Sequence, residues 1–434
     1  MHFDSLKGWL DWQETLHPKS IDLGLERVSK VFARLNPQAV KPVTITVAGT
    51  NGKGSSIAFL EAIYRAQGIH VGAYTSPHII DYNERIKVNG IAASDELICA
   101  SFERIEAVRD NISLSYFEFS TLAALDIFAR ANVEIQLLEV GLGGRLDAVN
   151  IVDADACIIT SISIDHTSWL GETREEIAFE KAGILRSNIA AIIGDSNPPQ
   201  SLINYAEEIQ APLLRIDHEF SFKKSSDYWS WHNQDTHIAT LPTPLLKGEH
   251  QYRNASSVLA AIQTLQNKIP VSVQAIKHGI SHVNLPGRFQ LIPSKPDVLL
   301  DVSHNPQAAQ ALIKYLQAEF NQIPIHAVFT MMNDKDLAGV IKLMQPAIKH
   351  WYISPLDNPR NSKSSDLLDA FSLNQITQLS TDFKDFISAF QAARVGALAD
   401  NGIILIFGSF FLVSEYLSLF SKNSDNKSQG KEYE

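Results

Sequence analysis

Short apolar runs alternate with amphipathic stretches along most of the chain. From Val43 onward, the strand-like runs "VTITVAG", "VGAYTS", "IQLLEVG", "ACIITSISI" and "AAIIGD" are separated by stretches with helical spacing, of which "SSIAFLEAIYRAQG" is the first. Nearly continuous apolar runs of this length are typical of parallel strands that are buried on both faces. The pattern therefore predicts an α/β domain with a mainly parallel sheet covered by helices.

The alternation stops in residues 199–247, where Ser, Asn, Asp, Trp and His are frequent, and we expect meandering strands and loops there. It restarts after "LPGRF" with "DVLLDVSHN", "IHAVFTMM", "WYISPL" and "GIILIFGS". Pro and Gly in residues 285–287 mark a break between domains. We predict one domain at 1–286, a smaller Rossmann-like α/β domain at 287–420, and a flexible tail without apolar anchors at 421–434.

Composition narrows the class of protein. The chain has 434 residues and a formal net charge of −11, so it repels polyanions, and we expect neither a nucleic-acid nor a membrane partner. Its two cysteines, Cys99 and Cys157, lie in apolar segments and form neither a disulfide framework nor a CxxC pair. We expect a cytoplasmic protein without a signal peptide or membrane span. No coiled-coil repeat is visible, so we expect a monomer.

The segment "VAGTNGKGSS" has the features of a phosphate-binding loop. A predicted buried strand ends in glycines and a helix follows directly, so backbone N–H groups and the helix N-terminus can hold phosphate oxygens, with Lys53 adding positive charge. A tight turn without a ligand is the alternative. The usual GxxxxGK[ST] spacing is not met, because Val47 and Gly54 replace the first glycine and the hydroxyl that holds Mg²⁺. The first domain is therefore predicted to be a P-loop-type ATPase whose metal ligands come from elsewhere.

Other strand ends provide candidate metal ligands. "YTSPH" offers Ser76, "LLEVGLGG" offers Glu139, and "SISIDHTSWLG" offers Asp165 and His166. Each follows a predicted parallel strand, so all should lie at the edge of the sheet that carries the phosphate loop. A hydroxyl, a carboxylate and an imidazole can together hold Mg²⁺, although imidazole is an unusual ligand for this ion. Taken alone, each residue is more often a hydrogen-bonding group at the end of a strand.

Several further polar residues have two interpretations. Lys181 in "EEIAFEKAGIL" is either a surface lysine or a cation near the metal, where it would need chemical modification to avoid repulsion. Arg288 in "LPGRF" carries a guanidinium suited to a γ-phosphate. Asp301 and His304 in "DVSHNPQAA" are either site residues or part of a capped helix start, and Asn254 either caps a helix or faces a nucleotide.

Together these motifs resemble the folylpolyglutamate synthase/dihydrofolate synthase family of the Mur ligase superfamily. The resemblance runs from about residue 21 to residue 414 and is carried by "IDLGLERV", "VAGTNGKGS", "TSPH", "NERIKVNG", "YFEFSTLAAL", "EVGLGGRLDAVN", "SIDHTSWLG", "EKAGI", "LPGRF", "DVSHNP", "MMNDKD" and "FGSFFLV". The early "IDLGLERV" and "YFEF" resemble the bacterial bifunctional type.

The resemblance implies a set of ligand-binding residues. ATP would be contacted by Thr50, Asn51, Gly52, Lys53, Asn254, Arg288 and Asp301, with Asp301 at the ribose. Mg²⁺, with K⁺ as an optional second cation, would be bound by Ser76, Glu139 and His166. The pterin would lie against Asp22, Phe117 and Asp147. The catalytic residues would be Lys53, Lys181, Arg288 and His304, with Lys181 carbamylated and therefore negatively charged.

The implied activity is ATP-dependent ligation. The resemblance implies that the carboxylate of dihydropteroate or a reduced folate is phosphorylated, and that the amine of L-glutamate then displaces phosphate, with His304 orienting glutamate or accepting its proton. A cell-wall Mur ligase is a rival, but it would need a whole nucleotide-sugar domain before the phosphate loop, and only residues 1–42 precede Val43. A regulatory P-loop ATPase is another, and it would hydrolyse nucleotide without an acceptor.

Overall fold

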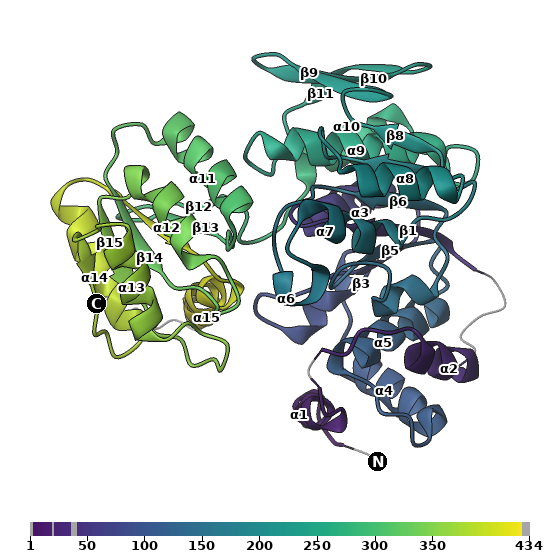
Figure 1. Cartoon of the computed structure of the whole chain (residues 1–434), viewed down its shortest axis with the longest axis horizontal. Helices are drawn as coiled ribbons and strands as arrows, with labels where there is room; N and C mark the ends of the chain where they lie inside the picture. Colours follow the sequence, from purple (N-terminus) through teal and green to yellow (C-terminus); the bar gives the residue numbers. More distant parts are fainter. Residues whose placement is uncertain (1–2, 20, 36–40, 428–434) are drawn as a thin grey trace. The chain divides into compact units, whose positions relative to one another are not determined.

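The computed structural model describes residues 3–19, 21–35 and 41–427 of the chain (Figure 1). The chain divides into two compact units, the first made of residues 1–245 and 250–284 and the second of residues 246–249 and 285–434. The expected domain boundary after residue 286 lies beside this division. Of the tail expected at 421–434, residues 421–427 belong to the last helix, and the remaining ones lie outside the described residues.

The first unit is built on one sheet of eight strands. Their order in space is β4-β3-β2-β5-β1-β6-β7-β8, and all pairs are parallel except those that involve β3 or β4. The bounds are β1 (Val43–Ala48), β2 (Val71–Tyr74), β3 (Ile86–Val88), β4 (Ile91–Ala92), β5 (Ile135–Glu139), β6 (Ala156–Ile159), β7 (Ala191–Ile193) and β8 (Leu213–Arg215). The prediction of a mainly parallel sheet in an α/β fold is therefore confirmed.

Helices surround this sheet. They are α1 (Leu6–Leu16), α2 (Glu26–Leu35), α3 (Lys53–Ala66), α4 (Asp95–Arg109), α5 (Tyr116–Arg130), α6 (Thr167–Leu170), α7 (Arg174–Ala182), α8 (Gln200–Glu208), α9 (His250–Thr264) and α10 (Val273–His282), with 3₁₀ turns η1 (Tyr82–Arg85) and η2 (Ala148–Ile151). Side-chain caps fix several starts: Ser94 caps α4, and Ser115 and Thr173 form capping boxes at α5 and α7. These caps fix the residues at which the loops before α4, α5 and α7 end.

The central strand β1 determines where a ligand can bind. It lies between β5 and β6, with Val47 opposite Glu139 and Ala48 opposite Ile159. The chain moves from β1 to β2 on one side and later to β6, β7 and β8 on the other. Strand order therefore reverses at β1, and in open α/β sheets such a switch point leaves a crevice beyond the carboxyl ends of the strands.

The expectation for residues 199–247 was partly wrong. This segment begins with helix α8 and strand β8, which extends the parallel sheet beside β7. Only β9 (Phe220–Lys224), β10 (Tyr228–Asn233) and β11 (His237–Pro242) form the expected antiparallel meander. In Figure 1 this small sheet lies beside α9 and α10, and its strands contact both helices. The buried pair Leu202 and Ala206, spaced by four, was the helical signal among the polar residues of α8.

The second unit is a smaller α/β layer structure. Its strands β12 (Gln290–Ile292), β13 (Val298–Asp301), β14 (Ile325–Phe329), β15 (His350–Ile353), β16 (Leu379–Ser380) and β17 (Ile403–Phe407) have the order β12-β13-β17-β14-β15-β16, parallel except for β12. Its helices are α11 (Pro306–Glu319), α12 (Leu337–Met344), α13 (Ser364–Leu373), α14 (Phe386–Ala399) and α15 (Phe410–Lys427), with the 3₁₀ turn η3 (Gln345–Ala347). Helix α12 ends at Met344, because Pro346 follows in η3.

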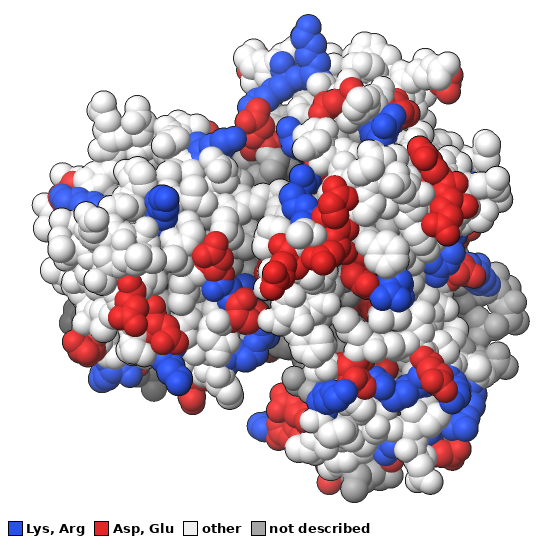
Figure 2. All heavy atoms as spheres, in the orientation of Figure 1, with Lys and Arg blue, Asp and Glu red and all other residues white. Residues whose placement is uncertain are grey.

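Surface charge and helix composition are the features that relate to two expectations, that the chain has no nucleic-acid partner and no membrane span. On the face drawn in Figure 2, acidic and basic side chains are interspersed rather than gathered into one continuous basic surface. Among the described residues, none of the helices combines the length and the apolar character that a bilayer crossing requires.

The close approach of α10 to α3 gives a test of the first unit's packing. A Cβ on Gly279 would lie 2.6 Å from the Cα atom and 2.7 Å from the backbone nitrogen of Ile63, so backbone would have to move. We expect Gly279→Ala to lower the free energy of unfolding by roughly 1–3 kcal/mol in urea titrations. The matched change Gly8→Ala in α1, where a Cβ would have only ordinary contacts at 3.4 Å, should be neutral or stabilising. Equal effects of the two changes would contradict this account.

Candidate active site

The phosphate-type loop joins β1 directly to α3. Gly49 has a φ of 144° and Gly52, the N-cap of α3, has a φ of 96°. A Cβ on Gly49 would come within 1.9 Å of the Thr160 hydroxyl, and one on Gly52 within 2.6 Å of Asn254 Oδ1. Both glycines are therefore required by conformation and by close neighbours. The resulting turn exposes backbone N–H groups at a helix N-terminus, as an anion-binding site needs.

Contacts to the segment after β6 hold this loop in place. The Thr50 backbone N–H donates to the Ser161 carbonyl at 2.6 Å, and the Thr50 hydroxyl donates to the Ser163 carbonyl at 3.2 Å. The Asn51 carbonyl accepts from the Thr160 hydroxyl at 2.7 Å. Lys53 Nζ donates to the Gly49 and Thr50 carbonyls at 3.1 and 3.2 Å, so the ammonium is folded over the loop. The Thr50 hydroxyl thus anchors the loop.

Asn254 is positioned by α9 rather than by a helix start. It lies in the first turns of α9, is buried, and donates from Nδ2 to Gln251 Oε1 at 2.9 Å. The cap interpretation of Asn254 is therefore wrong, because the residue is inside the helix. Its carboxamide oxygen instead faces Gly52 of the loop.

Two of the three candidate metal ligands are in direct contact. The Ser76 backbone N–H donates to Glu139 Oε2 at 3.1 Å, and Glu139 is buried at the last position of β5. His166 follows β6, with a φ of 53°, and its backbone N–H donates to Asp165 Oδ1 at 2.8 Å. Within the described part of the chain there is no group of three or more His, Cys, Asp and Glu side chains able to hold a metal. A hydroxyl, a carboxylate and an imidazole fit a cation that also takes phosphate oxygens and water as ligands.

Lys181 is buried in α7, which excludes the interpretation as a surface lysine. Burial and, after it, the positive charge of Lys53 together lower the pKa of its amine to about 7, against the opposing effect of Asp165 and Asp147. The amine is therefore largely uncharged slightly above neutral pH. The charges of Lys53, Asp165 and Asp147 are thus within electrostatic reach of the Lys181 amine.

The three predicted substrate residues lie around the segment after β5. Asp147 is buried, and burial raises its pKa to about 7, although the backbone N–H groups of Leu142 and Val149 donate to its two oxygens at 2.8 and 3.0 Å. The Phe117 ring packs against Gly141, where a Cβ would lie 2.6 Å from the ring. Phe117 and Asp147 therefore contact neighbouring residues, Gly141 and Leu142, of the segment that follows β5.

Asp22 reaches the same region through a network of side chains. His17 Nε2 lies 3.1 Å and Lys19 Nζ 3.2 Å from its carboxylate, and Arg27 also donates to it. Arg27 Nη2 donates to Glu118 Oε1 at 3.1 Å, on the residue after Phe117. The donation from Lys19 is the largest effect on the pKa of Asp22, and together with the charge and the donation of Arg27 it keeps this pKa below its ordinary value against the opposing effect of desolvation.

In the second unit, Phe410 lies beside two of the predicted residues, Arg288 and His304. The Arg288 guanidinium carbon lies 5.0 Å from the centre of the Phe410 ring, and the His304 ring centre lies 5.9 Å from it. His304 Nδ1 lies 2.9 Å from the Val302 carbonyl, an acceptor, so Nδ1 carries a proton and Nε2 holds the lone pair of the neutral ring. Asp301 is buried, and burial raises its pKa although Ser303 and the Phe289 N–H donate to it. Asn305 caps α11, as the alternative interpretation of this motif expected.

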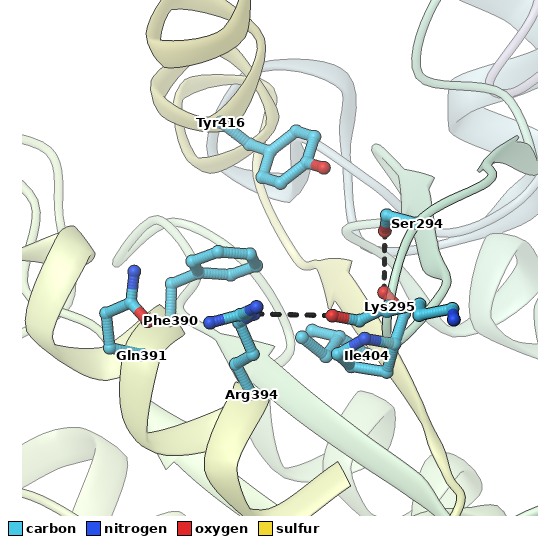
Figure 3. Close-up of a pocket in the computed structure, with 8 residues that line it drawn as sticks. Ser294, Lys295, Phe390, Gln391, Arg394, Ile404 and Tyr416 are labelled. Atoms are coloured by element: carbon cyan, nitrogen blue, oxygen red, sulfur yellow. Dashed lines mark hydrogen bonds between the residues drawn. The ribbon is translucent and has the colours of Figure 1, made fainter. Parts of the chain in front are cut away.

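A separate cavity of about 390 Å³ in the second unit is not part of this group (Figure 3). It is lined by Ser294, Lys295, Pro296, Phe390, Gln391, Arg394, Ile404 and Tyr416. Ile404 pairs with Val298, the first residue of β13, whereas Asp301 is the last. The cavity therefore lies at the amino end of the strand that carries Asp301 at its carboxyl end.

Sequence analysis missed four residues that organise these sites. His17, Arg27 and Glu118 position the Asp22 segment, and Phe410 lies between Arg288 and His304. Arg27 and Glu118 occur in the quoted motifs "IDLGLERV" and "YFEF", so their presence was visible. Their pairing was not, because it joins positions that are far apart in the chain.

Known protein families and relatives match most of this chain. The chain matches the family models described as "Mur ligase middle domain" over residues 47–262 and "Mur ligase, glutamate ligase domain" over residues 287–410. The fold and the phosphate loop thus define an ATP-dependent ligase of the Mur ligase class. The chain is 41% identical over 414 residues to the dihydrofolate synthase/folylpolyglutamate synthase of Escherichia coli (strain K12), with 95% of each chain covered. It belongs to the dihydrofolate synthase/folylpolyglutamate synthase family.

Other relatives and solved structures agree. The Haemophilus influenzae dihydrofolate synthase/folylpolyglutamate synthase is 38% identical over 432 residues, covering 95% of this chain and 96% of the relative. The structure of E. coli FolC in complex with DHPP and ADP matches with a TM-score of 0.91 and 40% identity, covering 97% and 99% of the two chains. A bifunctional folylpolyglutamate synthase/dihydrofolate synthase with Mn, AMPPNP and L-glutamate bound matches with a TM-score of 0.88 and 40% identity, covering 96% and 98%.

The buried amine of Lys181 predicts a pH-dependent stability. In the unfolded chain its pKa is near 10.5 and in the folded chain about 7, so between these values the unfolded state binds a proton that the folded state does not. The free energy of unfolding should therefore rise with pH across this window, by up to about 1 kcal/mol per pH unit. We expect Lys181→Met to be more stable than the wild type at pH 7 and to show a shallower rise, in urea titrations in CO₂-free buffer. The exposed control Lys30→Met should keep the wild-type slope; an unchanged slope in Lys181→Met would contradict this assignment.

Proposed function

We propose that this ligase joins L-glutamate to dihydropteroate, giving dihydrofolate, and to reduced folates, giving folylpolyglutamates, with release of ADP and phosphate. The observation that carries the proposal is the pairing of β1 with β5, because the phosphate loop leaves the sheet beside the strand end that leads to Gly141 and Leu142. Gly141 packs against the Phe117 ring and the Leu142 N–H donates to Asp147, and an aromatic face with a carboxyl group suits a flat heterocycle. The relatives named above support the choice of substrates.

The chemistry requires activation of a carboxylate, because hydroxide is a poor leaving group. The acceptor carboxylate attacks the γ-phosphorus of ATP, a new O–P bond forms, and ADP leaves. The amine of L-glutamate then attacks the carbonyl carbon, the C–N bond forms, and phosphate leaves while the amine loses its proton. Catalysis of the first step is positioning and charge neutralisation, to which Lys53 and Arg288 contribute.

The nucleotide is proposed to bind through the loop and its neighbours. Its contacts would be Thr50, Asn51, Gly52, Lys53 and Asn254 in the first unit and Arg288 and Asp301 in the second. Ser76, Glu139 and His166 would hold Mg²⁺, with K⁺ as an optional second cation. When bound, the divalent ion neutralises charge that develops on the phosphates. Asp22, Phe117 and Asp147 would hold the pterin. On the second unit, His304 would orient glutamate and accept its proton at Nε2.

Carbamylation of Lys181 would resolve the repulsion between a lysine and the metal. A neutral amine attacks carbon dioxide, an N–C bond forms, and a proton is released, which leaves a carbamate anion. The lowered pKa of Lys181 supports this reaction because it supplies the neutral amine near pH 7.

We further propose that the protein is a monomer that acts in the cytoplasm on small molecules, without a nucleic-acid or membrane partner.

Nucleotide turnover tests the proposed reaction. We expect ADP formation to require an acid acceptor and L-glutamate together, because only the complete reaction regenerates free enzyme. The measurement is coupled-assay ADP release with dihydropteroate, with L-glutamate, and with both. Lys53→Ala should lower kcat/KM by about 100-fold or more, since a charge at the transferred phosphoryl is lost, and His304→Gln should raise the KM for L-glutamate. ADP release that ignores both acceptors would instead indicate a regulatory ATPase.

Removal of carbon dioxide tests the proposed modification. Ligase activity should fall when the protein is equilibrated in CO₂-depleted buffer and return on addition of bicarbonate, because the carbamate forms reversibly. Intact-protein mass spectrometry at alkaline pH should show the mass of one added carbon dioxide on the wild type and not on Lys181→Met. Activity that is indifferent to bicarbonate, with no mass increment, would show that Lys181 acts as an unmodified amine.

A further inference from the structure

A buried guanidinium lies outside the residues assigned so far. Counted over the whole residue, Arg85 and Lys181 are the only lysines or arginines of the described part of the chain that are buried. Arg85 ends the turn η1 within the motif "NERIKVNG", and it is 9% exposed. Burying a charge is costly unless it is paired.

No carboxylate of the described part of the chain forms an ion pair with Arg85. Its Nε donates to His78 Nδ1 at 2.8 Å, and an imidazole carries no negative charge in either protonation state. The nearby Glu84 carboxylate accepts three backbone N–H groups, from Ile79, Ile80 and Asp81, at 2.8 to 2.9 Å. Two other buried charges are paired: Asp126 with Arg104 and Arg130, and Glu118 with Arg27. The absence of an ion pair with a described carboxylate distinguishes Arg85 from these two groups.

Two aromatic rings hold the guanidinium plane. Its central carbon lies 5.5 Å from the ring centre of Tyr82 and 5.5 Å from that of Tyr116. These contacts and the bond from Nε leave the Nη1 and Nη2 end of the group for a further ligand. The recorded side-chain hydrogen bond of Arg85 comes from Nε, and neither Nη nitrogen belongs to the fully buried polar atoms without a partner, so this end keeps some exposed surface. Two parallel N–H groups at the end of a guanidinium match the two oxygens of a carboxylate.

The position of Arg85 indicates which carboxylate fits. Its carbonyl accepts from the Thr75 N–H at 2.9 Å, which places its backbone beside the residue that precedes Ser76. Its guanidinium meets Tyr116, the neighbour of Phe117, and the Phe117 and Tyr74 ring centres are 5.9 Å apart. Arg85 thus lies between the aromatic surface proposed for the pterin and the strand end proposed for the metal.

From this geometry we propose that Arg85 binds the carboxylate of the acid acceptor through its Nη1 and Nη2 groups. The aromatic ring that carries this carboxylate would lie along Tyr116. The identity of the acceptor in this assignment rests on the proposed function. Arg85 would hold the reacting carboxylate before phosphorylation. The carboxylate would in turn be the counterion that the buried guanidinium lacks.

Binding of an acid and its amide tests this assignment. The probes are pteroate and the same molecule with its carboxylate replaced by a carboxamide, titrated by fluorescence into protein saturated with AMPPNP and Mg²⁺. The wild type should bind pteroate about 10- to 100-fold more tightly than the amide, because a charge-assisted bidentate pair is lost in the amide. Arg85→Gln should bind both as weakly as the wild type binds the amide. Arg85→Lys, which keeps the charge without the fork, should be intermediate.

Arg109 provides a matched control. It is also largely buried against an aromatic ring, 5.3 Å from that of Trp12, but it is paired with Glu106. Arg109→Gln should lower the Tm of the ligand-free protein and keep the preference for the acid. Arg85→Gln should leave that Tm unchanged or raise it, because it removes a buried charge without a carboxylate partner. If Arg85→Gln does not fold, Arg85→Lys carries the comparison.

The outcomes separate this assignment from the proposed function. A full preference for pteroate in both Arg85 variants would overturn the assignment. So would variants that keep this preference but raise the KM for L-glutamate, which would assign the guanidinium to a carboxylate of glutamate. A wild-type protein that binds neither probe and forms no ADP with dihydropteroate and L-glutamate would overturn the proposed function itself.

Discussion

Parallel pairing of β1 with β5 and β6 is the constraint on which the site of the first unit depends. Because Val47 is opposite Glu139 and Ala48 is opposite Ile159, three strands end at the same edge. The loop to α3, the carboxylate of Glu139 and the segment that carries His166 must therefore leave the sheet together. A one-residue slip of β5 would turn the Glu139 side chain to the other face of the sheet, away from the Ser76 backbone it now accepts from.

Positive charge inside this unit is balanced in different ways. Lys181 reduces the cost of burial through a lowered pKa, so its amine is largely uncharged slightly above neutral pH. A guanidinium cannot do this, because it stays protonated in proteins. Arg85 instead combines two aromatic faces with an accessible end. Asp22 shows the reverse arrangement, because one carboxylate has several nitrogen partners. These are the His17 ring, the Lys19 ammonium and the Arg27 guanidinium. Lys181, Arg85 and Asp22 thus show three different ways of compensating charge in one unit.

The order of strands and helices could largely be predicted, because buried parallel strands produce uninterrupted apolar runs such as those of β1, β5 and β17. The short β8 and the polar helix α8 could not, since three strand residues and one apolar pair give too weak a periodicity. The glycine loop and the strand-end residues Ser76 and Glu139 were visible as local patterns. The contact of Asn254 with Gly52 and the pair of Arg27 with Glu118 were not, because they depend on how distant helices pack.

The discontinuity of the first unit has a consequence for biosynthesis. The neighbour that Gly52 packs against, Asn254, and the helix whose Gly279 lies against Ile63 are both encoded long after the loop itself. A nascent chain released from the ribosome only as far as β8 would possess every parallel strand of the sheet but lack the helices α9 and α10. Until translation has passed residue 284, the flank of α3 that α9 and α10 cover in the folded unit therefore stays open.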